Sequence, residues 1–284
     1  MIVDLEKSSN FISGWIEACA RQAKAKSLVV GLSGGVDSAL VLALALKTNL
    51  PVHAVLLPCH SSDSASVRAE EAISALNTDN LSVHVIDLRS AFSSINEQVV
   101  IKPDLYDKNA AEGALRSTLR APALDYIAKL YGGIIVGTGN RDEDEVTRYY
   151  QKRGDGAVDV SPIAKLHKSE VYQLAAYLNV PKSILEARPS ADLWGPDSGQ
   201  EDERQLGMTY KQIEETTRLV ESIYETTSGA AFLQLAKSFK KFGLAAETVS
   251  LLETLGKMEL ASRHKANPAI PVCDVRVIGA GMVE

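Results

Sequence analysis

The stretch LVVGLSGGVDS, residues 28–38, decides the fold class, because it leads from an apolar run through a glycine-rich turn into a helical pattern. We expect a strand before the turn and a helix after it. Backbone N–H groups then converge at the start of the helix, where unpaired donors and the helix dipole both favour an anion. Gly34 and Gly35 allow positive φ angles and close approach of a ligand, and the hydroxyls of Ser33 and Ser38 add donors. The stretch therefore predicts a phosphate site.

An aspartate distinguishes this turn from the Walker phosphate loop, which requires GxxxxGK[ST]. The turn contains no lysine, and Asp37 would repel a bound polyphosphate unless a cation lay between them. Mg²⁺ held by a carboxylate and by phosphate oxygens removes the conflict. The residues themselves therefore suggest a cradle for magnesium pyrophosphate.

Working outward, further short apolar runs are separated by helical patterns. Strands are expected at 27–32, 52–57, 82–88 and 133–138, and helices at 8–24, 37–47, 64–77 and 109–131, with the serines at the start of the first helix as its N-cap. This alternation predicts an α/β fold with a doubly wound, mostly parallel sheet and flanking helices. Patterns at 168–178, 203–226, 231–242 and 246–261 predict a helical C-terminal part.

Composition excludes several classes of protein. The 284 residues carry 30 Lys+Arg against 36 Asp+Glu, a net charge of −6, which argues against sequence-independent nucleic-acid binding. Three scattered cysteines indicate neither a disulfide framework nor a zinc site. No run has the length of a signal peptide core or a membrane span, so we expect a cytoplasmic protein. We expect residues 1–284 to form a single domain, in which the glycine- and proline-rich segment 188–202 is a mobile lid.

Several motifs carry a family resemblance. SGGVDS resembles the pyrophosphatase-type loop of enzymes that cleave ATP between the α and β phosphates, adenylate an acceptor and release pyrophosphate. The later segments GTGNRDE (137–143), KRGDGAVD (152–159), PIAKLHK (162–168), RPSADLW (188–194) and SRHK (262–265) resemble, in order and spacing, the ammonia-dependent NAD synthetases. The resemblance extends from about residue 10 to 271. It implies an adenine nucleotide alpha-hydrolase-like fold, a homodimer, and ATP-dependent amidation of deamido-NAD to NAD with ammonia through an adenylate.

The resemblance also implies roles for single residues, matched position by position. The ATP-binding set is Gly31, Leu32, Ser33, Gly34, Gly35, Val36, Asp37, Ser38, Thr138, Lys168 and Ser190. The implied Mg²⁺ ligands are Asp37 and Glu143. The implied deamido-NAD-binding residues are Lys152, Asp159, His264 and Lys265. Asp37, Lys152 and Lys168 would be catalytic, because the approach of a carboxylate to ATP needs cations and because charge develops on the leaving pyrophosphate.

Which acid is assigned as the second Mg²⁺ ligand depends on how the chain is aligned with the family pattern. One residue more than the family pattern separates Thr138 from the turn at residues 154–156. Counting forward from Thr138 selects Glu143, whereas counting back from the turn selects Asp144. We favour Glu143, and Glu145 is the third alternative.

One departure from the family concerns the acceptor. The family typically reads NxxARxRM on the helix after residue 109, and its first arginine binds deamido-NAD. Here the aligned positions are Ala114, Thr118 and Arg120, with Arg116 on another side of the helix. We therefore predict weak deamido-NAD binding that Thr118→Arg would tighten. The alternatives are a relative that amidates a different carboxylate, and an adenine-nucleotide-binding module without turnover.

Overall fold

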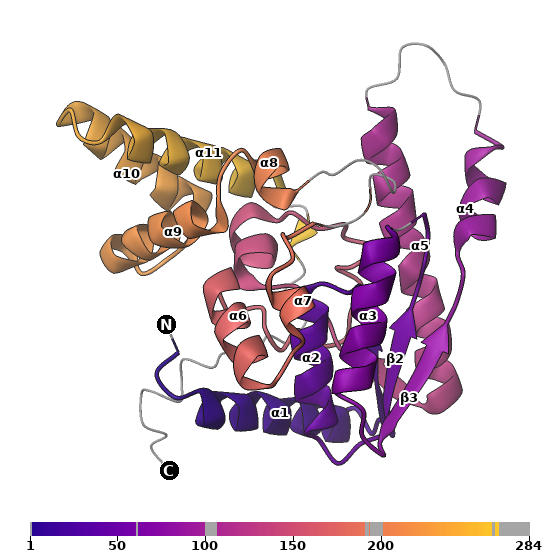
Figure 1. Cartoon of the computed structure of the whole chain (residues 1–284). Coiled ribbons are helices and arrows are strands. Elements are labelled where there is room, and N and C mark those ends of the chain that lie inside the picture. The colour runs from indigo at the N-terminus through magenta and orange to yellow at the C-terminus, as the bar shows by residue number, and fades with distance from the viewer. Residues whose placement is uncertain are drawn as a thin grey trace.

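A four-stranded sheet lies at the centre of the molecule. The computed structural model describes residues 2–60, 62–99, 107–190, 193, 201–262 and 265–266 (Figure 1). The strands are β1 (Ser27–Gly31), β2 (Val52–Leu56), β3 (Leu81–Val85) and β4 (Gly133–Ile135), in the order β3-β2-β1-β4, and every pairing is parallel. The predicted parallel sheet is confirmed.

Helices cover both faces of this sheet, as the doubly wound prediction requires. One face packs against α1 (Leu5–Gln22), α2 (Val36–Leu46), α3 (Asp63–Ala75) and α6 (Lys168–Tyr177), and the other against α4 (Arg89–Asn96) and α5 (Lys108–Tyr131). Successive residues of β1 alternate between the two layers: Leu28 and Val30 join the first core, and Val29 joins the second. Such runs are apolar on both sides because neither face meets water.

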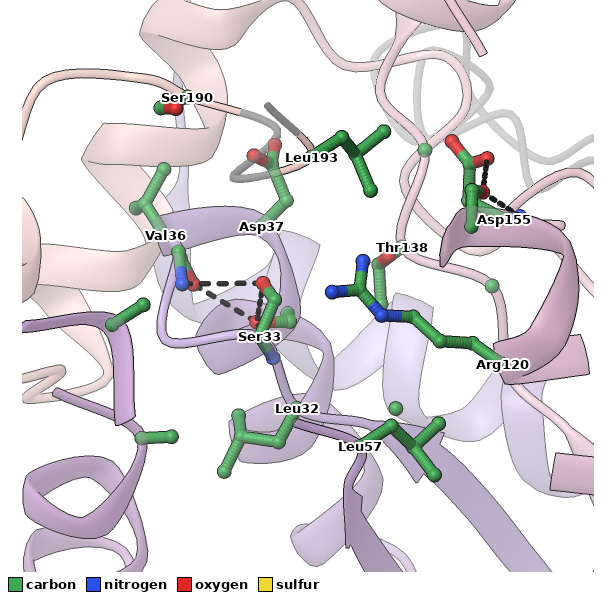
Figure 2. A pocket seen from close by; sticks show the side chains of 18 of the residues that line it. Leu32, Ser33, Val36, Asp37, Leu57, Arg120, Thr138, Asp155, Ser190 and Leu193 are labelled. Atoms are coloured by element: carbon green, nitrogen blue, oxygen red, sulfur yellow. Dashed lines mark hydrogen bonds between the residues drawn. The ribbon is translucent and has the colours of Figure 1, made fainter. Parts of the chain in front are cut away.

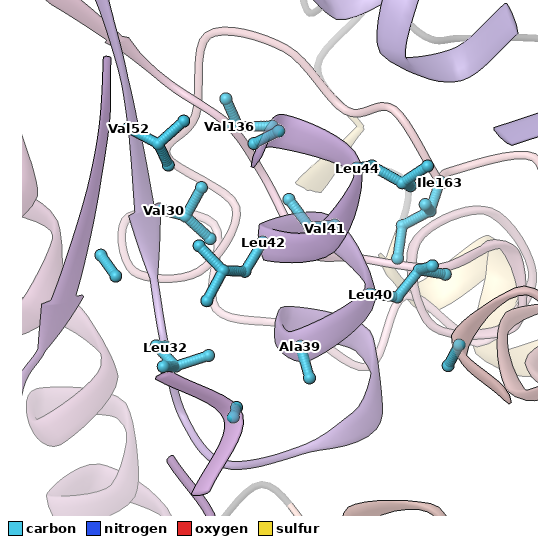
Figure 3. Close-up of a cluster of buried hydrophobic side chains, with 14 of the residues drawn as sticks. Val30, Leu32, Ala39, Leu40, Val41, Leu42, Leu44, Val52, Val136 and Ile163 are labelled. Carbon is cyan, nitrogen blue, oxygen red and sulfur yellow. The ribbon is translucent and has the colours of Figure 1, made fainter. Parts of the chain in front are cut away.

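Helix α2 is the most deeply embedded element. Its residues from Ala39 to Ala45 are all buried, and Val41, Leu42 and Leu44 contribute to the core that Val30 and Val136 supply from the sheet side (Figure 3). A helix that is apolar all round is typical of a core position. The phosphate turn is therefore attached to a helix that has little freedom to move.

The C-terminal part is helical, as expected, and has its own apolar core. After α7 (Lys182–Leu185), which packs on the core of the sheet, it comprises α8 (Asp202–Leu206), α9 (Tyr210–Tyr224), α10 (Gly229–Lys241) and α11 (Ala246–Ser262). Helices α9, α10 and α11 lie to one side of the sheet (Figure 1), around the fully buried Phe232. Val146, from a short helix η1 (Asp142–Thr147), also enters this core.

Three local predictions were wrong. The helix expected over 203–226 is two helices, because Gly207 adopts a left-handed conformation and ends α8. The N-cap of α1 is Asp4, whose carboxylate accepts from the N–H of Lys7, rather than a serine. The short helices α4, α7 and η1 were not predicted, because segments of four to eight residues carry little periodicity.

The strand order locates the natural ligand site. From β1 the chain runs outward to β2 and β3, and then returns to place β4 on the other side of β1. Ligands of open α/β sheets bind at the carboxyl ends of the strands where this reversal occurs. The turn after β1 and the loop after β4 meet at this point. Within the described residues, no helix is long and apolar enough to cross a membrane.

Candidate active site

A cavity of about 430 Å³ opens at the reversal point of the sheet. The loops after β1 and β4 line it, together with residues of α5, the start of α6 and parts of the 188–202 segment (Figure 2). Its volume lies within the range of small-molecule sites. It contains every residue of the predicted ATP-binding set except the buried Gly34, namely Gly31, Leu32, Ser33, Gly35, Val36, Asp37, Ser38, Thr138, Lys168 and Ser190.

The phosphate turn has the geometry expected of an anion cradle. Gly35 is the N-cap of α2 and supplies no side-chain acceptor, so the first N–H groups of the helix remain available for a ligand. The Ser33 and Ser38 hydroxyls lie 3.1 Å apart, and the Ser38 hydroxyl donates to the carbonyl of Gly35 over 3.0 Å. These bonds hold the turn in shape without any ligand.

Only one of the two glycines has the predicted positive φ. Gly34 has a φ of +81°, and a Cβ atom there would overlap the backbone carbonyl of Ala65 on α3. Gly35 has a φ of −92°, so the expectation of a positive φ at this residue is wrong. Gly34 is therefore required by the backbone and by close packing.

Lys168 joins the two predicted metal ligands. Its Nζ atom, at the first residue of α6, lies 2.6 Å from Oδ2 of Asp37 and 2.9 Å from Oε1 of Glu143. Asn140 holds the same acids: its Nδ2 donates to Oδ1 of Asp37 over 3.0 Å, and its Oδ1 accepts from the N–H of Glu143 over 3.2 Å. The tertiary structure thus brings residues 37, 143 and 168 to one point beside the phosphate turn.

The charges at this point are strongly coupled. Burial raises the pKa of Asp37 above its ordinary value, against the opposing charge of Lys168. Burial also acts to raise the pKa of Glu143, but Lys168 and the hydroxyl of Tyr210 outweigh it, so the pKa is lowered. Burial would lower the pKa of Lys168, but the two carboxylates reverse this and raise it. The two carboxylates therefore favour the protonated form of Lys168.

The three acids that the sequence left as alternatives lie in one short element. Residues 142–147 form a π-helix, which takes up one residue more than an α-helical segment of the same height. Both Glu143 and Asp144 line the cavity, and the Asp144 carboxylate lies so close to Gly139 that a Cβ atom there would overlap it.

Burial, together with the neighbouring acids Glu143, Asp155 and Asp37, raises the pKa of Asp144 well above its ordinary value. Glu145 has a different environment, because it pairs with Lys165 over 2.9 Å and accepts from Thr227 over 2.8 Å. These contacts direct Glu145 away from the cavity, towards the C-terminal helices.

Sequence reasoning missed several residues that line the cavity or contact its charged groups. Tyr210 donates to Oε1 of Glu143 over 2.6 Å, and its ring centroid lies 4.8 Å from Nζ of Lys168. Arg120 extends from α5 into the cavity (Figure 2). Asp155, interpreted as a turn residue, accepts from the N–H of Gln151 within its turn and also lines the cavity. Arg120 is the arginine retained on the helix after residue 109, but the sequence did not show that its side chain, or that of Tyr210, points towards the site.

The expected acceptor-binding residues do not line this cavity. Lys152 is exposed outside it, and Oδ2 of Asp159 accepts from the N–H of Ile135 at the outer edge of β4 over 2.7 Å. Nζ of Lys265 donates to the backbone carbonyls of Arg148 and Tyr150 over 3.0 and 2.8 Å. His264 lies outside the described residues. Thr118, at the family arginine position, is half-buried and also absent from the cavity wall.

The donor set fits a magnesium ion. Asp37 and Glu143 present two hard oxygen ligands to one point next to the phosphate turn, and Mg²⁺ binds to proteins through one or two carboxylates together with substrate phosphates. No group of three or more histidine, cysteine or acidic side chains surrounds a common point among the described residues. The protein therefore supplies part of a coordination sphere that a polyphosphate would complete.

Comparison with known proteins agrees with this geometry. The family model described as NAD synthase matches residues 8–242. The NH(3)-dependent NAD(+) synthetase of Carboxydothermus hydrogenoformans is 36% identical over 216 residues, which cover 75% of this chain and 86% of the relative.

Solved structures have the same fold. The NMN synthetase of Francisella tularensis aligns with a TM-score of 0.75 and 29% identity, covering 95% of this chain and 98% of that one. The NH3-dependent NAD synthetase of Campylobacter jejuni aligns with a TM-score of 0.67 and 23% identity, covering 93% and 98%. The chain therefore belongs to the NAD synthase family of ligases.

Proposed function

We propose that the cavity binds ATP and activates the carboxylate of deamido-NAD for amidation by ammonia. ATP-dependent amidation of deamido-NAD to NAD is the activity that family membership assigns to the chain. The observation that carries the proposal is the meeting of Asp37, Glu143 and Lys168 beside the uncapped start of α2. One site thus combines anion donors, metal ligands and a buried cation, which is what cleavage of a magnesium-bound polyphosphate requires.

The lining of the cavity suggests how ATP lies. Leu32 and Leu57 form an apolar part suited to adenine, and Ser33 and Ser38 lie at the phosphate turn. We infer that the β and γ phosphates rest on the turn and that Thr138 contacts the nucleotide from the end of β4. Ser190 lines the cavity at the beginning of the 188–202 segment. Because residues 191–192 and 194–200 lie outside the described residues, the lid stays a prediction.

Asp37 and Glu143 would hold Mg²⁺. When bound, Mg²⁺ would neutralise phosphate charge as the pyrophosphate leaves. The protein's own part is to keep both carboxylates directed at one point, which Asn140 and Tyr210 do through hydrogen bonds. Lys168 would compensate further negative charge, and its raised pKa keeps it protonated at neutral pH.

The reaction needs no nucleophile from the protein. A carboxylate oxygen of the acceptor attacks the α-phosphorus of ATP, a new O–P bond forms, and the bond to the β-phosphate breaks with its electron pair leaving on pyrophosphate. Ammonia then attacks the carbonyl carbon of the adenylate, the bond to AMP breaks with its electron pair leaving on AMP, and the nitrogen releases one proton to water, which gives the amide. The chain contributes positioning and charge stabilisation, and exclusion of water protects the adenylate.

The acceptor site extends beyond the described cavity. The family's acceptor-binding positions Lys152, Asp159 and Lys265 lie outside it, whereas the ATP-binding positions converge inside. We therefore propose a homodimer in which a second copy of the chain completes the acceptor site. Light scattering at micromolar concentration should give twice the mass of the chain. A fully active monomer would contradict this.

A second acceptor has specific support. Thr118 replaces the arginine through which the family binds deamido-NAD, and the chain is 29% identical to an NMN synthetase at a TM-score of 0.75. Nicotinic acid mononucleotide carries the same reacting carboxylate without the adenylate half, so its binding needs fewer contacts outside the cavity. We propose it as the alternative substrate.

One experiment separates these functions. Pyrophosphate release is measured with ATP, Mg²⁺ and ammonia, in the presence of deamido-NAD, of nicotinic acid mononucleotide or of neither. Release that depends on deamido-NAD supports the leading proposal, and a higher kcat/KM for the mononucleotide selects the alternative. Pyrophosphate release in the absence of any acceptor would refute both proposals. So would a lack of release with either acceptor.

A further inference from the structure

Helix α5 directs one face into the cavity. Ser117, Arg120 and Leu124 line the cavity, and their spacing of three and four residues is that of a single helix face. The guanidinium group of Arg120 points towards the space between Ser33 and Thr138 (Figure 2). Thr118, two residues earlier, is absent from this wall. The cation that α5 presents to the nucleotide is thus at position 120.

The cavity has two chemically different parts, and Arg120 lies between them. Leu32 and Leu57 form the apolar part, whereas the phosphate turn with Asp37 and Lys168 forms the charged part (Figure 2). An ATP molecule with adenine in the apolar part and its β and γ phosphates on the turn has its α-phosphate between the two. The Arg120 guanidinium faces this intermediate position.

Contacts of the two residues one turn before Arg120 hold this part of α5 in place. The Ser117 hydroxyl donates to Oδ1 of Asp155 over 2.8 Å, which ties α5 to the turn at residues 151–156. Arg116 pairs with Glu112 over 3.1 Å and stacks 4.7 Å above the ring of Phe92. The backbone at residue 120 is therefore positioned by bonds that do not involve the ligand.

We infer that Arg120 binds the α-phosphate of ATP and stabilises the charge that develops there during adenylate formation, an inference that rests on the proposed function. In that step the acceptor carboxylate oxygen bonds to the α-phosphorus, the bond to the β-phosphate breaks, and pyrophosphate leaves with the electron pair. No proton moves. The non-bridging oxygens of the α-phosphate lie on the reacting centre throughout, and a guanidinium can bind two of them at once.

The first test measures the rate of adenylate formation. Pyrophosphate release is followed in a single turnover at saturating ATP and acceptor for wild type, Arg120→Gln and Arg120→Lys. We expect Arg120→Gln to slow release about 100- to 1,000-fold, the usual cost of removing one donor to a developing charge. Arg120→Lys should recover part of the rate, because lysine restores the positive charge but lacks the planar guanidinium group that binds two oxygens at once. Lys129→Gln removes an exposed charge from the same helix and should leave the rate unchanged.

The second test does not depend on turnover. Calorimetry compares the affinity of each variant for AMP, which carries only the α-phosphate, and for adenosine, which carries none. We expect Arg120→Gln to weaken AMP roughly 10- to 100-fold, as loss of a charge-assisted bond does, and to leave adenosine binding unchanged. Thermal melting of each variant confirms that it is folded.

The outcomes separate this inference from the proposed function. An unchanged rate of pyrophosphate release in Arg120→Gln would overturn the inference, as would an effect confined to the KM of the acceptor. If wild type shows no turnover with either acceptor, the proposed function fails. In that case the binding measurements still test the role of Arg120. If the ratio of AMP affinity to adenosine affinity is the same in wild type and in Arg120→Gln, the inference is overturned.

Discussion

Removal of the Asp37 carboxylate tests the charge balance of the site. Asp37, Glu143 and Lys168 together carry a formal charge of −1, and Asp37 supplies the shorter of the two contacts to Nζ, 2.6 Å against 2.9 Å. In Asp37→Ala or Asp37→Asn the lysine remains paired with Glu143, so no buried charge is left without a partner. The fold should therefore survive while the metal site loses a ligand.

Loss of one partner of a buried pair costs about 3–5 kcal/mol when the other charge is left uncompensated. Because Glu143 still compensates Lys168, we expect the free energy of unfolding to fall by less than about 3 kcal/mol, against a typical total of about 5–15 kcal/mol. Catalysis depends on both carboxylates, so pyrophosphate release should fall by more than about 1,000-fold.

The assay combines urea unfolding with acceptor-dependent pyrophosphate release over a range of Mg²⁺ concentrations. Asp125→Asn, an exposed change on α5, serves as the control for loss of one carboxylate charge. Wild-type pyrophosphate release by Asp37→Ala would refute the assignment of this residue to the metal site. Failure of both Asp37 variants to fold would refute the charge argument.

Among the acids of η1, Glu143→Gln should raise the Mg²⁺ concentration needed for half-maximal rate at least tenfold, whereas Glu145→Gln, which loses only structural partners, should lower thermal stability without changing that concentration. A larger Mg²⁺ effect in Asp144→Asn than in Glu143→Gln would transfer the ligand to position 144. Thr118→Arg should lower the KM for deamido-NAD roughly tenfold through a charge-assisted bond, and an unchanged KM would show that the acceptor does not pass this face of α5. Burial lowers the pKa of His53, and the charge of His84 on β3 lowers it further. The folded protein therefore binds the second imidazole proton of His53 less tightly than the unfolded chain does. Stability should therefore fall as the pH drops below about 6.5, by about 1.4 kcal/mol per unit of pKa depression, and urea unfolding at pH 7.5 and 5.5 should show a smaller loss in His53→Gln.

Much of the architecture could be predicted from local patterns. The strand at residues 27–31 and the helix at 36–46 follow from apolar runs on either side of a glycine-rich turn, and the structure has both within one residue of the expected ranges at most ends. Burial of β1 on both faces could be predicted because most residues of such a strand must be apolar. The phosphate turn was identifiable for the same reason: its strand, its glycines and its helix are contiguous in the chain.

The side chains around that turn were harder to assign. Asp37 and Lys168 are 131 residues apart, and only packing of α6 against α2 brings them within 2.6 Å. A resemblance proposed both residues, but it did not reveal that one lysine joins two carboxylates. Asp159, assigned to deamido-NAD through the resemblance, accepts a hydrogen bond at the edge of β4 and does not line the ATP cavity, so its role towards the acceptor stays a prediction.

The sequence alone therefore determined the fold class and the phosphate turn, because these depend on residues that are neighbours along the chain, and the order of its motifs indicated the type of reaction through a family resemblance. Only the tertiary structure decided which acids face the cavity: Glu143 and Asp144 line it, whereas Glu145 binds Lys165 and Thr227 instead. It also decided that Arg120 and Tyr210 enter the site and that Thr118 does not. The direction of a side chain depends on the helix that carries it and on what that helix packs against, and both arise from contacts between distant segments.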